Sequence, residues 1–215
     1  MSSPLSKGID ADCSLESVAG DLVKAGFSWV GRYIKPGMSK GLSLAEARHL
    51  SSMGLYILSI VELGFPTTVE HFTPRIGSSD AVTAVSYARN VLKQPVISKG
   101  TGLPTSLMIT VDYDATESDQ AAIESYFVAF NTVNKAHAVG GESYVLGVYG
   151  SGAICEFLKS KGLVTHTWLS ESSGFRGSKT YTSWDIHQTG SGEFDRLSVD
   201  FNVSKPNMTG AWNYA

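Results

Sequence analysis

Two aspartates close the apolar run Leu107–Ala115, and their type and spacing could do chemistry. In a β-strand, residues two apart project from the same face, so we expect Asp112 and Asp114 to stand side by side. Carboxyl groups crowded in a partly desolvated place raise one another's pKa, and a carboxyl that keeps its proton near neutral pH can act as a general acid. The pair therefore indicates acid-base chemistry at the end of a buried strand.

Acids and aromatic residues recur where the other expected strands end. In α/β barrels the active site lies at the carboxyl ends of the strands. The resulting candidates for catalysis are Asp10, Glu62, Asp112 and Asp114, and those for substrate binding are Asp12, Arg32, Tyr33, Tyr149, Trp168, Trp184, Gln188 and Asp200. Asp185 has the opposite parity to Trp184 and Gln188, so only one of these sets faces the barrel interior, and we favour the latter. Acids gathered with aromatic side chains match the needs of glycoside hydrolysis.

Two other uses of these acids remain open. An acid after a strand is often the N-cap of the next helix, and Asp12 and Asp114 each precede such a start. A cluster of Asp10, Asp112, Asp114 and Asp200 could instead hold a hard cation through oxygen ligands. The five histidines show no zinc-binding spacing, and we expect neither a metal site nor a cofactor.

The elements that must position these residues alternate between apolar runs and amphipathic stretches. Strands are expected at 8–12, 27–34, 55–62, 107–115, 144–150, 164–171, 182–189 and 196–202, and helices at 14–26, 43–54, 80–94, 118–137 and 151–162. After Gly162 the connections are Gly/Ser-rich and lack helical periodicity. This pattern favours an α/β TIM-like barrel with eight strands and about five helices, its last strands joined by loops, over an open doubly wound sheet.

Composition limits the classes of partner. The 215 residues suit one domain spanning residues 1–215, and 42% hydrophobic with 17% charged residues describes an ordinary globular chain. A formal net charge of −3 without a Lys/Arg cluster argues against nucleic-acid binding, and no window is long enough for a membrane span. Cys13 and Cys155 are too few for a disulfide framework, and we expect both to be reduced.

An ordered set of motifs resembles a bacterial family known as glycoside hydrolase-like, which is related to the family 25 lysozymes. The motifs are Gly8-Ile-Asp10, Phe27-Ser-Trp-Val-Gly-Arg-Tyr33, Leu42-Ser-Leu-Ala-Glu-Ala47, Val111-Asp-Tyr-Asp-Ala115, Gly147-Val-Tyr-Gly-Ser-Gly152, Trp168-Leu-Ser170 and Trp184-Asp-Ile-His-Gln188. The resemblance runs from about residue 7 to residue 204 and implies a TIM-like barrel with five helices and a mouth that binds or cleaves sugars.

Carried over by position, the resemblance implies roles for three segments. Asp10 is similar to the first-strand acid of the lysozymes, Asp112-Tyr-Asp114 to their Asp-x-Glu pair, and Asp200-Phe-Asn202 to their last-strand Asp-x-Asn. This chain has Asp114 where the lysozymes carry the glutamate general acid. A displacement near 1 Å can cost on the order of a hundredfold in rate, so Glu62 is a candidate substitute acid.

The leading hypothesis is a peptidoglycan-directed glycoside hydrolase of muramidase type. Asp114 or Glu62 would be the acid, and Asp112 or Asp10 the base or electrostatic partner. The alternatives are a catalytically silent module that binds cell-wall glycan and, third, a metal-dependent hydrolase.

The route to the cell wall is a separate expectation. Because Met1–Lys7 lacks the apolar stretch of a signal peptide, we expect a chain that is made in the cytoplasm and acts on the wall after non-classical or dedicated export. A phage-type lysin and an exported effector toxin both fit this expectation. A secretion machine or an immunity protein would then be its partner.

Overall fold

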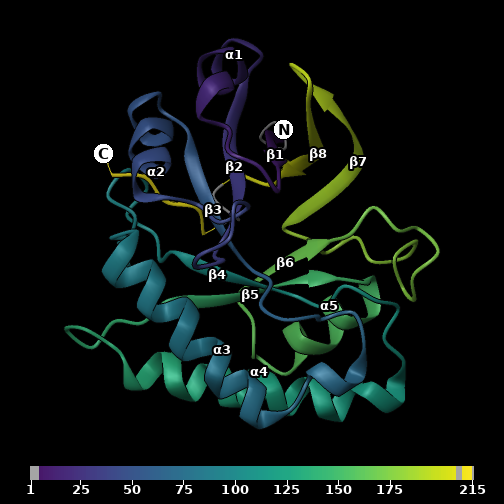
Figure 1. Ribbon diagram of the computed structural model, residues 1–215. Coiled ribbons are helices and arrows are strands. Elements are labelled where there is room, and N and C mark those ends of the chain that lie inside the picture. Colours follow the sequence, from purple (N-terminus) through teal and green to yellow (C-terminus); the bar gives the residue numbers. More distant parts are fainter. Residues whose placement is uncertain (1–4, 207–209, 215) are drawn as a thin grey trace.

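The computed structural model describes residues 5–206 and 210–214, and in these residues eight strands close into a barrel in chain order (Figure 1). The strands are β1 (Ser6–Asp10), β2 (Phe27–Tyr33), β3 (Tyr56–Val61), β4 (Ser106–Thr110), β5 (Val145–Gly150), β6 (His166–Leu169), β7 (Ile186–Phe194) and β8 (Leu197–Ser204). Each strand from β1 to β6 pairs in parallel with the next, whereas β8 is antiparallel to both β7 and β1.

The described residues form five α-helices, which lie between the first six strands along the chain. They are α1 (Ala19–Lys24), α2 (Leu44–Ser52), α3 (Pro74–Ser86), α4 (Gln120–Ala136) and α5 (Gly152–Ser160), with short 3₁₀ turns at Glu16–Val18, Val69–His71 and Glu117–Asp119 and a π-helical turn at Tyr87–Val91. Hydroxyl side chains cap three of the helices: Ser43, Thr73 and Ser151 accept bonds from backbone amides of the first turn. Because Thr73 caps α3 and Pro74 opens it, this helix begins six residues before the expected start at Asp80.

The last two strands form a long hairpin in place of a strand-helix unit. Only Asp195 and Arg196 separate β7 from β8, and both have positive φ, at 46° and 70°. Two such residues form the tight turn that suits the twist of antiparallel strands. The sequence pattern placed a Gly/Ser-rich loop at 190–195, but β7 continues through most of this segment.

The alternation of side chains decides which residues reach the barrel interior. Trp29, Leu58, Met108, Trp168 and Ile186 pack together inside the barrel, and their neighbours of opposite parity pack outward against the helices. The packed residues fill the middle of the barrel, so the polar side chains at the carboxyl ends of the strands form the floor and walls of an open cup.

The expected architecture is therefore confirmed: an α/β TIM-like barrel with eight strands and, in the described residues, five α-helices, with loops joining the last strands. That residues 1–215 form one domain stays a prediction. Across residues 5–206 and 210–214, no helix combines the length and apolarity that a membrane crossing needs.

Candidate functional site

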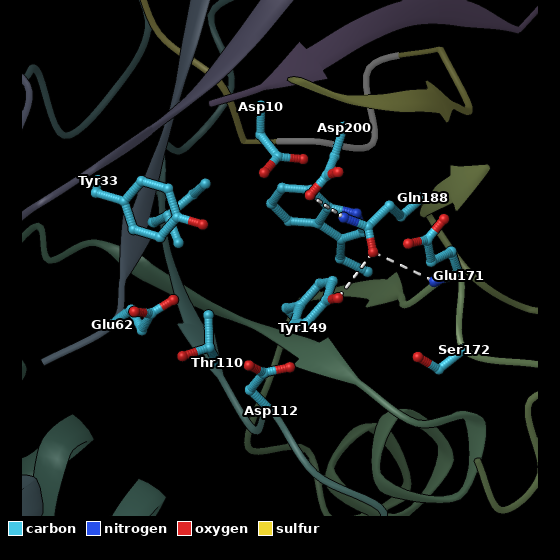
Figure 2. A pocket seen from close by; sticks show the side chains of 12 residues that line it. Asp10, Tyr33, Glu62, Thr110, Asp112, Tyr149, Glu171, Ser172, Gln188 and Asp200 are labelled. Carbon is cyan, nitrogen blue, oxygen red and sulfur yellow. Dashed lines mark hydrogen bonds between the residues drawn. The ribbon is translucent and has the colours of Figure 1, made fainter. Parts of the chain in front are cut away.

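A cup of about 290 Å³ opens at the carboxyl ends of the barrel strands (Figure 2). Five carboxyl side chains line it together with aromatic and neutral polar groups: Asp10, Glu62, Asp112, Glu171 and Asp200, with Tyr33, Ile60, Thr110, Tyr149, Trp168, Ser172 and Gln188. Asp10 closes β1, Glu62 directly follows β3, Glu171 lies two positions after β6, and Asp200 lies near the middle of β8. The residue two positions after β4, Asp112, completes the ring.

Asp10 forms the buried floor on the β1 and β8 side. Its carboxylate accepts a bond from Asn202 Nδ2 at 2.8 Å, and the Oδ1 atom of Asn202 accepts one from Trp168 Nε1 at 2.9 Å. Burial raises the pKa of Asp10 to about 8, against the lowering effect of the Asn202 bond, and the charges of Asp200, Glu171 and Glu62 raise it further. Asp10 is thus a carboxylic acid that keeps its proton at neutral pH.

Gln188 links three walls of the cup, as Figure 2 shows. Its Nε2 donates to Asp200 Oδ2 at 2.8 Å, and its Oε1 accepts from Tyr149 Oη at 2.8 Å and from the backbone amide of Glu171 at 3.3 Å. Burial, then Glu171 and Asp12, raise the pKa of Asp200, while the bond from Gln188 lowers it. The three bonds of Gln188 fix the orientation of its side-chain amide and hold Asp200, Tyr149 and Glu171 in place.

Glu62 directly follows β3, and its carboxylate forms an ion pair at the edge of the cup. Lys40 Nζ lies 2.7 Å from Glu62 Oε1, and Lys35 Nζ donates to the backbone carbonyl of Glu62 at 2.8 Å. The same Lys40 ammonium lies 4.6 Å from the centre of the Tyr33 ring. The β2–α2 loop thus brings positive charge to one side of an otherwise acidic cup.

Asp112 lies next to Glu62 around the cup, because it follows β4, the strand that pairs with β3 (Figure 2). Its backbone amide donates to the carbonyl of Pro66 at 2.9 Å, which ties the end of β4 to the loop after β3. Burial raises the pKa of Asp112, the charge of Glu62 raises it further, and Lys40 lowers it. The environment therefore favours the protonated form of this carboxyl more than water does.

Asp114 does not share the face of Asp112, so the expectation that the two stand side by side is wrong. Strand β4 ends at Thr110, and a tight turn in which the Ala115 amide donates to the Tyr113 carbonyl breaks the alternation. The Asp114 side chain turns away from the cup and binds Arg176. It is not the helix cap either, because Thr116 and Asp119 form the capping box that precedes α4.

Three residues expected to bind substrate also lie outside the cup. Arg32 is fully buried behind β2, where Glu46 and the carbonyl of Ala11 bind it, because its parity is opposite to that of Tyr33. Trp184 precedes β7, and its ring packs against His187 and under Lys205. Asp12 is exposed and borders a neighbouring hollow of about 300 Å³, whose walls also include Asp10, Tyr33 and Asp200.

The remaining expected residues come together in the cup, and others join them. Asp10, Glu62, Asp112, Tyr33, Tyr149, Trp168, Gln188 and Asp200 all line it. Sequence reasoning did not select Lys40, Ser172 or Glu171 as site residues. Glu171 could have been found, because it follows β6 as the other acids follow their strands, whereas Lys40 and Ser172 lie in loops where no periodicity predicts orientation. In the described ranges, no three His, Cys, Asp or Glu side chains are arranged to hold a metal ion.

Comparison with known proteins finds a family and a fold. The model of a family described as Rv2525c-like, glycoside hydrolase-like domain matches residues 20–209. No curated protein matches the sequence.

Solved structures share the fold at low sequence identity. The Tat-secreted protein Rv2525c of Mycobacterium tuberculosis, in complex with HEPES, is 21% identical with a TM-score of 0.76, over 96% of this chain and 98% of that one. The catalytic domain of endolysin ply40 from Listeria monocytogenes bacteriophage P40 is 15% identical, with a TM-score of 0.57 over 97% of each chain. A muramidase from Trichobolus zukalii is 11% identical, with a TM-score of 0.53 over 91% of this chain and 92% of that one.

One expectation from the sequence is contradicted by this comparison. We expected a chain without a signal peptide that leaves the cytoplasm by non-classical or dedicated export. Rv2525c is a Tat-secreted protein, and the Tat route is addressed by an N-terminal signal. Part of the segment on which the expectation rested, residues 1–4, lies outside the described residues.

Proposed function

The chain belongs to the Rv2525c-like, glycoside hydrolase-like domain family, and from that premise we propose that it is a peptidoglycan-directed glycoside hydrolase. One observation carries the proposal: Asp112 and Glu62 line the cup from the ends of the paired strands β4 and β3, and the pKa of Asp112 is raised while Glu62 is paired with Lys40. Glycoside hydrolysis needs two carboxyl groups in different protonation states. The lysozyme-like fold shared with ply40 and the muramidase supports a glycan as the substrate.

Asp112 is the general acid in this proposal. Its protonated carboxyl donates to the glycosidic oxygen as the bond to the anomeric carbon breaks, which gives the leaving sugar a neutral hydroxyl. This role replaces the expected role of Asp114, whose carboxylate binds Arg176 outside the cup. The Asp112 carboxyl reaches the cup because its parity continues that of Thr110.

Glu62 is the carboxylate partner of Asp112. The ammonium of Lys40 at 2.7 Å balances its negative charge, and an ionised carboxylate can stabilise the positive charge that develops on the sugar ring or activate the attacking water. Lys40 holds Glu62 from the side of the β2–α2 loop, and the proton donor Asp112 follows the neighbouring strand β4.

The rest of the cup positions the sugar. Gln188 and Tyr149 form a fixed polar wall for sugar hydroxyls, and Tyr33 supplies aromatic surface. Protonated Asp10 can donate a hydrogen bond to a sugar oxygen from the floor, which an ionised aspartate cannot do. Tat secretion of Rv2525c supports placing this cup outside the cytoplasmic membrane, where peptidoglycan lies.

A second candidate, a glycan-binding module that does not cleave, is favoured by one observation. At the position where the family 25 lysozymes carry their glutamate acid, this chain has Asp114, which is committed to Arg176. The chain would then keep the cup that binds glycan and lack the glutamate general acid of the lysozymes.

Incubation with insoluble peptidoglycan separates the two candidates. The hydrolase proposal expects soluble fragments from the native protein and, for Asp112→Asn and Glu62→Gln, retention on the pellet without soluble fragments. Retention of the native protein with no soluble fragments would favour the binding module. A native protein that neither sediments with the pellet nor releases fragments would refute both candidates.

A further inference from the structure

The loop between β6 and β7, residues 170–185, contains no helix or strand, yet it supplies part of the cup wall (Figure 1). Glu171 and Ser172 line the cup near its start. Glu171 is held by the barrel, because its amide donates to Gln188 and the preceding Ser170 amide donates to the Gly150 carbonyl. Ser172 and the residues after it depend on contacts made further along the loop.

Asp114 provides the most polar of these contacts. Its Oδ1 accepts the backbone amide of Arg176 at 2.7 Å, and its Oδ2 accepts Nη1 of the same arginine at 2.6 Å. The Nη1 atom also donates to the Asp114 carbonyl at 2.9 Å. One aspartate thus binds both the main chain and the side chain of one loop residue, with charge on both partners.

The first turn of α5 completes the anchor. The Ala153 amide donates to the Arg176 carbonyl at 2.9 Å, and the Gly152 amide donates to Ser178 Oγ at 3.1 Å. Backbone bonds within the loop, from the Phe175 amide to the Ser172 carbonyl at 2.9 Å and from the Ser178 amide to the Phe175 carbonyl at 3.1 Å, connect the anchor to the cup wall. Displacement of Arg176 would therefore be transmitted to Ser172.

We propose that Asp114 is a positioning residue: through Arg176 it holds the 172–178 segment in place, so that Ser172 forms a fixed wall of the glycan cup. The identity of the ligand, a glycan, rests on the proposed function. The contact by which Asp114 anchors the loop rests on geometry alone. It assigns to Asp114 an indirect effect on glycan affinity in place of proton transfer.

The anchor is tested first without any ligand, by amide hydrogen exchange of peptides that cover residues 171–183. Asp114→Ala and Arg176→Ala should each speed exchange in this segment about tenfold or more, because charge-assisted bonds to the loop are lost. Asp114→Asn keeps an acceptor and Arg176→Lys keeps a charge, so both should lie between native and Ala. Unchanged exchange in the Ala variants, with the fold intact, would overturn the anchor.

A matched control uses another surface ion pair, which joins the end of α5 to α4. Lys161 and Glu124 lie 3.1 Å apart with side-chain exposures of 45% and 34%, against 51% and 34% for Arg176 and Asp114. Lys161→Ala should leave exchange in 171–183 unchanged. An equal acceleration in this control would show that loss of any surface charge loosens the loop, and the specific role of Asp114 would be refuted.

The effect on the cup is measured with a soluble peptidoglycan fragment, glycan strands that an amidase releases with all their glycosidic bonds intact. We expect Asp114→Ala to weaken binding about two- to tenfold, in proportion to the fraction of molecules whose loop is out of place. In turnover, KM should rise while kcat at saturation is retained, and Arg176→Lys should restore part of the affinity that Arg176→Ala loses. A looser loop with native affinity, or loss of kcat at unchanged KM, would overturn the positioning role.

The two proposals fail in different ways. If the native protein neither binds nor cleaves the fragment, the proposed function is wrong, and the exchange data still decide whether Asp114 holds Ser172. If the native protein binds the fragment and the Ala variants bind it equally, the proposed function stands and this inference is wrong.

Discussion

Replacing Arg32 by Met should lower the free energy of unfolding of the barrel and leave the cup unchanged. Arg32 and Glu46 are buried partners: Arg32 Nε donates to Glu46 Oε1 at 2.8 Å, Nη2 donates to Oε2 at 3.3 Å, and Nη1 binds the Ala11 carbonyl. The Leu15 amide also donates to Glu46 Oε1, at 3.0 Å. The pair therefore ties β2 to α2 and to the loop after β1.

The magnitude follows from burial. The side chains of Arg32 and Glu46 are 0% and 3% exposed, and removing one partner of a buried ion pair costs about 3–5 kcal/mol because the other charge is left uncompensated. For a domain of this size, 1 kcal/mol shifts Tm by about 2–4 °C, so Arg32→Met should lower Tm by roughly 6–20 °C. Glu46→Gln leaves the buried guanidinium of Arg32 charged and uncompensated, so it should lower the free energy of unfolding by a similar amount, about 3–5 kcal/mol.

Urea unfolding monitored by circular dichroism measures these differences. Lys24→Met breaks the exposed ion pair with Asp21 and should change the midpoint by no measurable amount. Binding of peptidoglycan by folded Arg32→Met should equal that of the native protein. A stable Arg32→Met variant that has lost glycan binding would refute the reasoning, because it would place the guanidinium in substrate recognition.

Two further predictions concern the packing of Gly8 against Trp29 inside the barrel and the buried carboxyl of Asp10. A Cβ on Gly8 would lie 2.1 Å from the Trp29 ring, so Gly8→Ala should destabilise by about 1–3 kcal/mol in the same urea assay. Gly20→Ala, where the nearest atom is at 3.4 Å within α1, should be neutral or stabilising, and the reverse order would contradict this packing. Asp10, with a pKa of about 8 in the folded state against an ordinary value of 3.8, keeps a proton on folding between about pH 4 and 8. Native stability should therefore fall with rising pH across this window by up to about 1.4 kcal/mol per unit relative to Asp10→Asn, and parallel pH curves for the two proteins would show that Asp10 is ionised in the fold.

The barrel could be predicted because its signals are local. Ser43 before an apolar-periodic run marks the start of α2, and Gly54 follows its end, as the structure confirms. Each strand-helix unit repeats such signals, and their count alone favours a barrel. The tight turn between β7 and β8 was missed because Arg196 does not mark a turn with positive φ, although aspartates such as Asp195 tolerate this conformation.

The cup was predictable only where the strand alternation holds. Tyr33, Thr110 and Asp112 follow the parity of their strands into the cup, and the same rule sends Arg32 outward, which makes Tyr33 and Arg32 incompatible as neighbours in one site. Asp114 lies past a turn that no residue pattern announces. Its partner Arg176 is 62 positions away, and a contact of that range depends on the folded topology.

The residues that bind the carboxyls of the cup also lie far from them in the sequence. Lys40 reaches Glu62 across 22 positions, and Gln188 joins Tyr149 and Asp200 from three different strands. Composition and spacing can propose a set of carboxyls, but which one keeps its proton depends on burial and on these neighbours. We therefore propose Asp112, in place of Asp114, as the general acid.

Digestion of purified peptidoglycan in ¹⁸O-labelled water, followed by mass spectrometry of the soluble products, tests the central claim most directly. The account predicts that the native protein releases fragments with a single ¹⁸O at each new reducing end, because water attacks the anomeric carbon. Asp112→Asn should release none, and Asp114→Asn should release the same products at saturating substrate. Absence of labelled ends from the native protein under conditions where a muramidase produces them, or undiminished release by Asp112→Asn, would contradict the account.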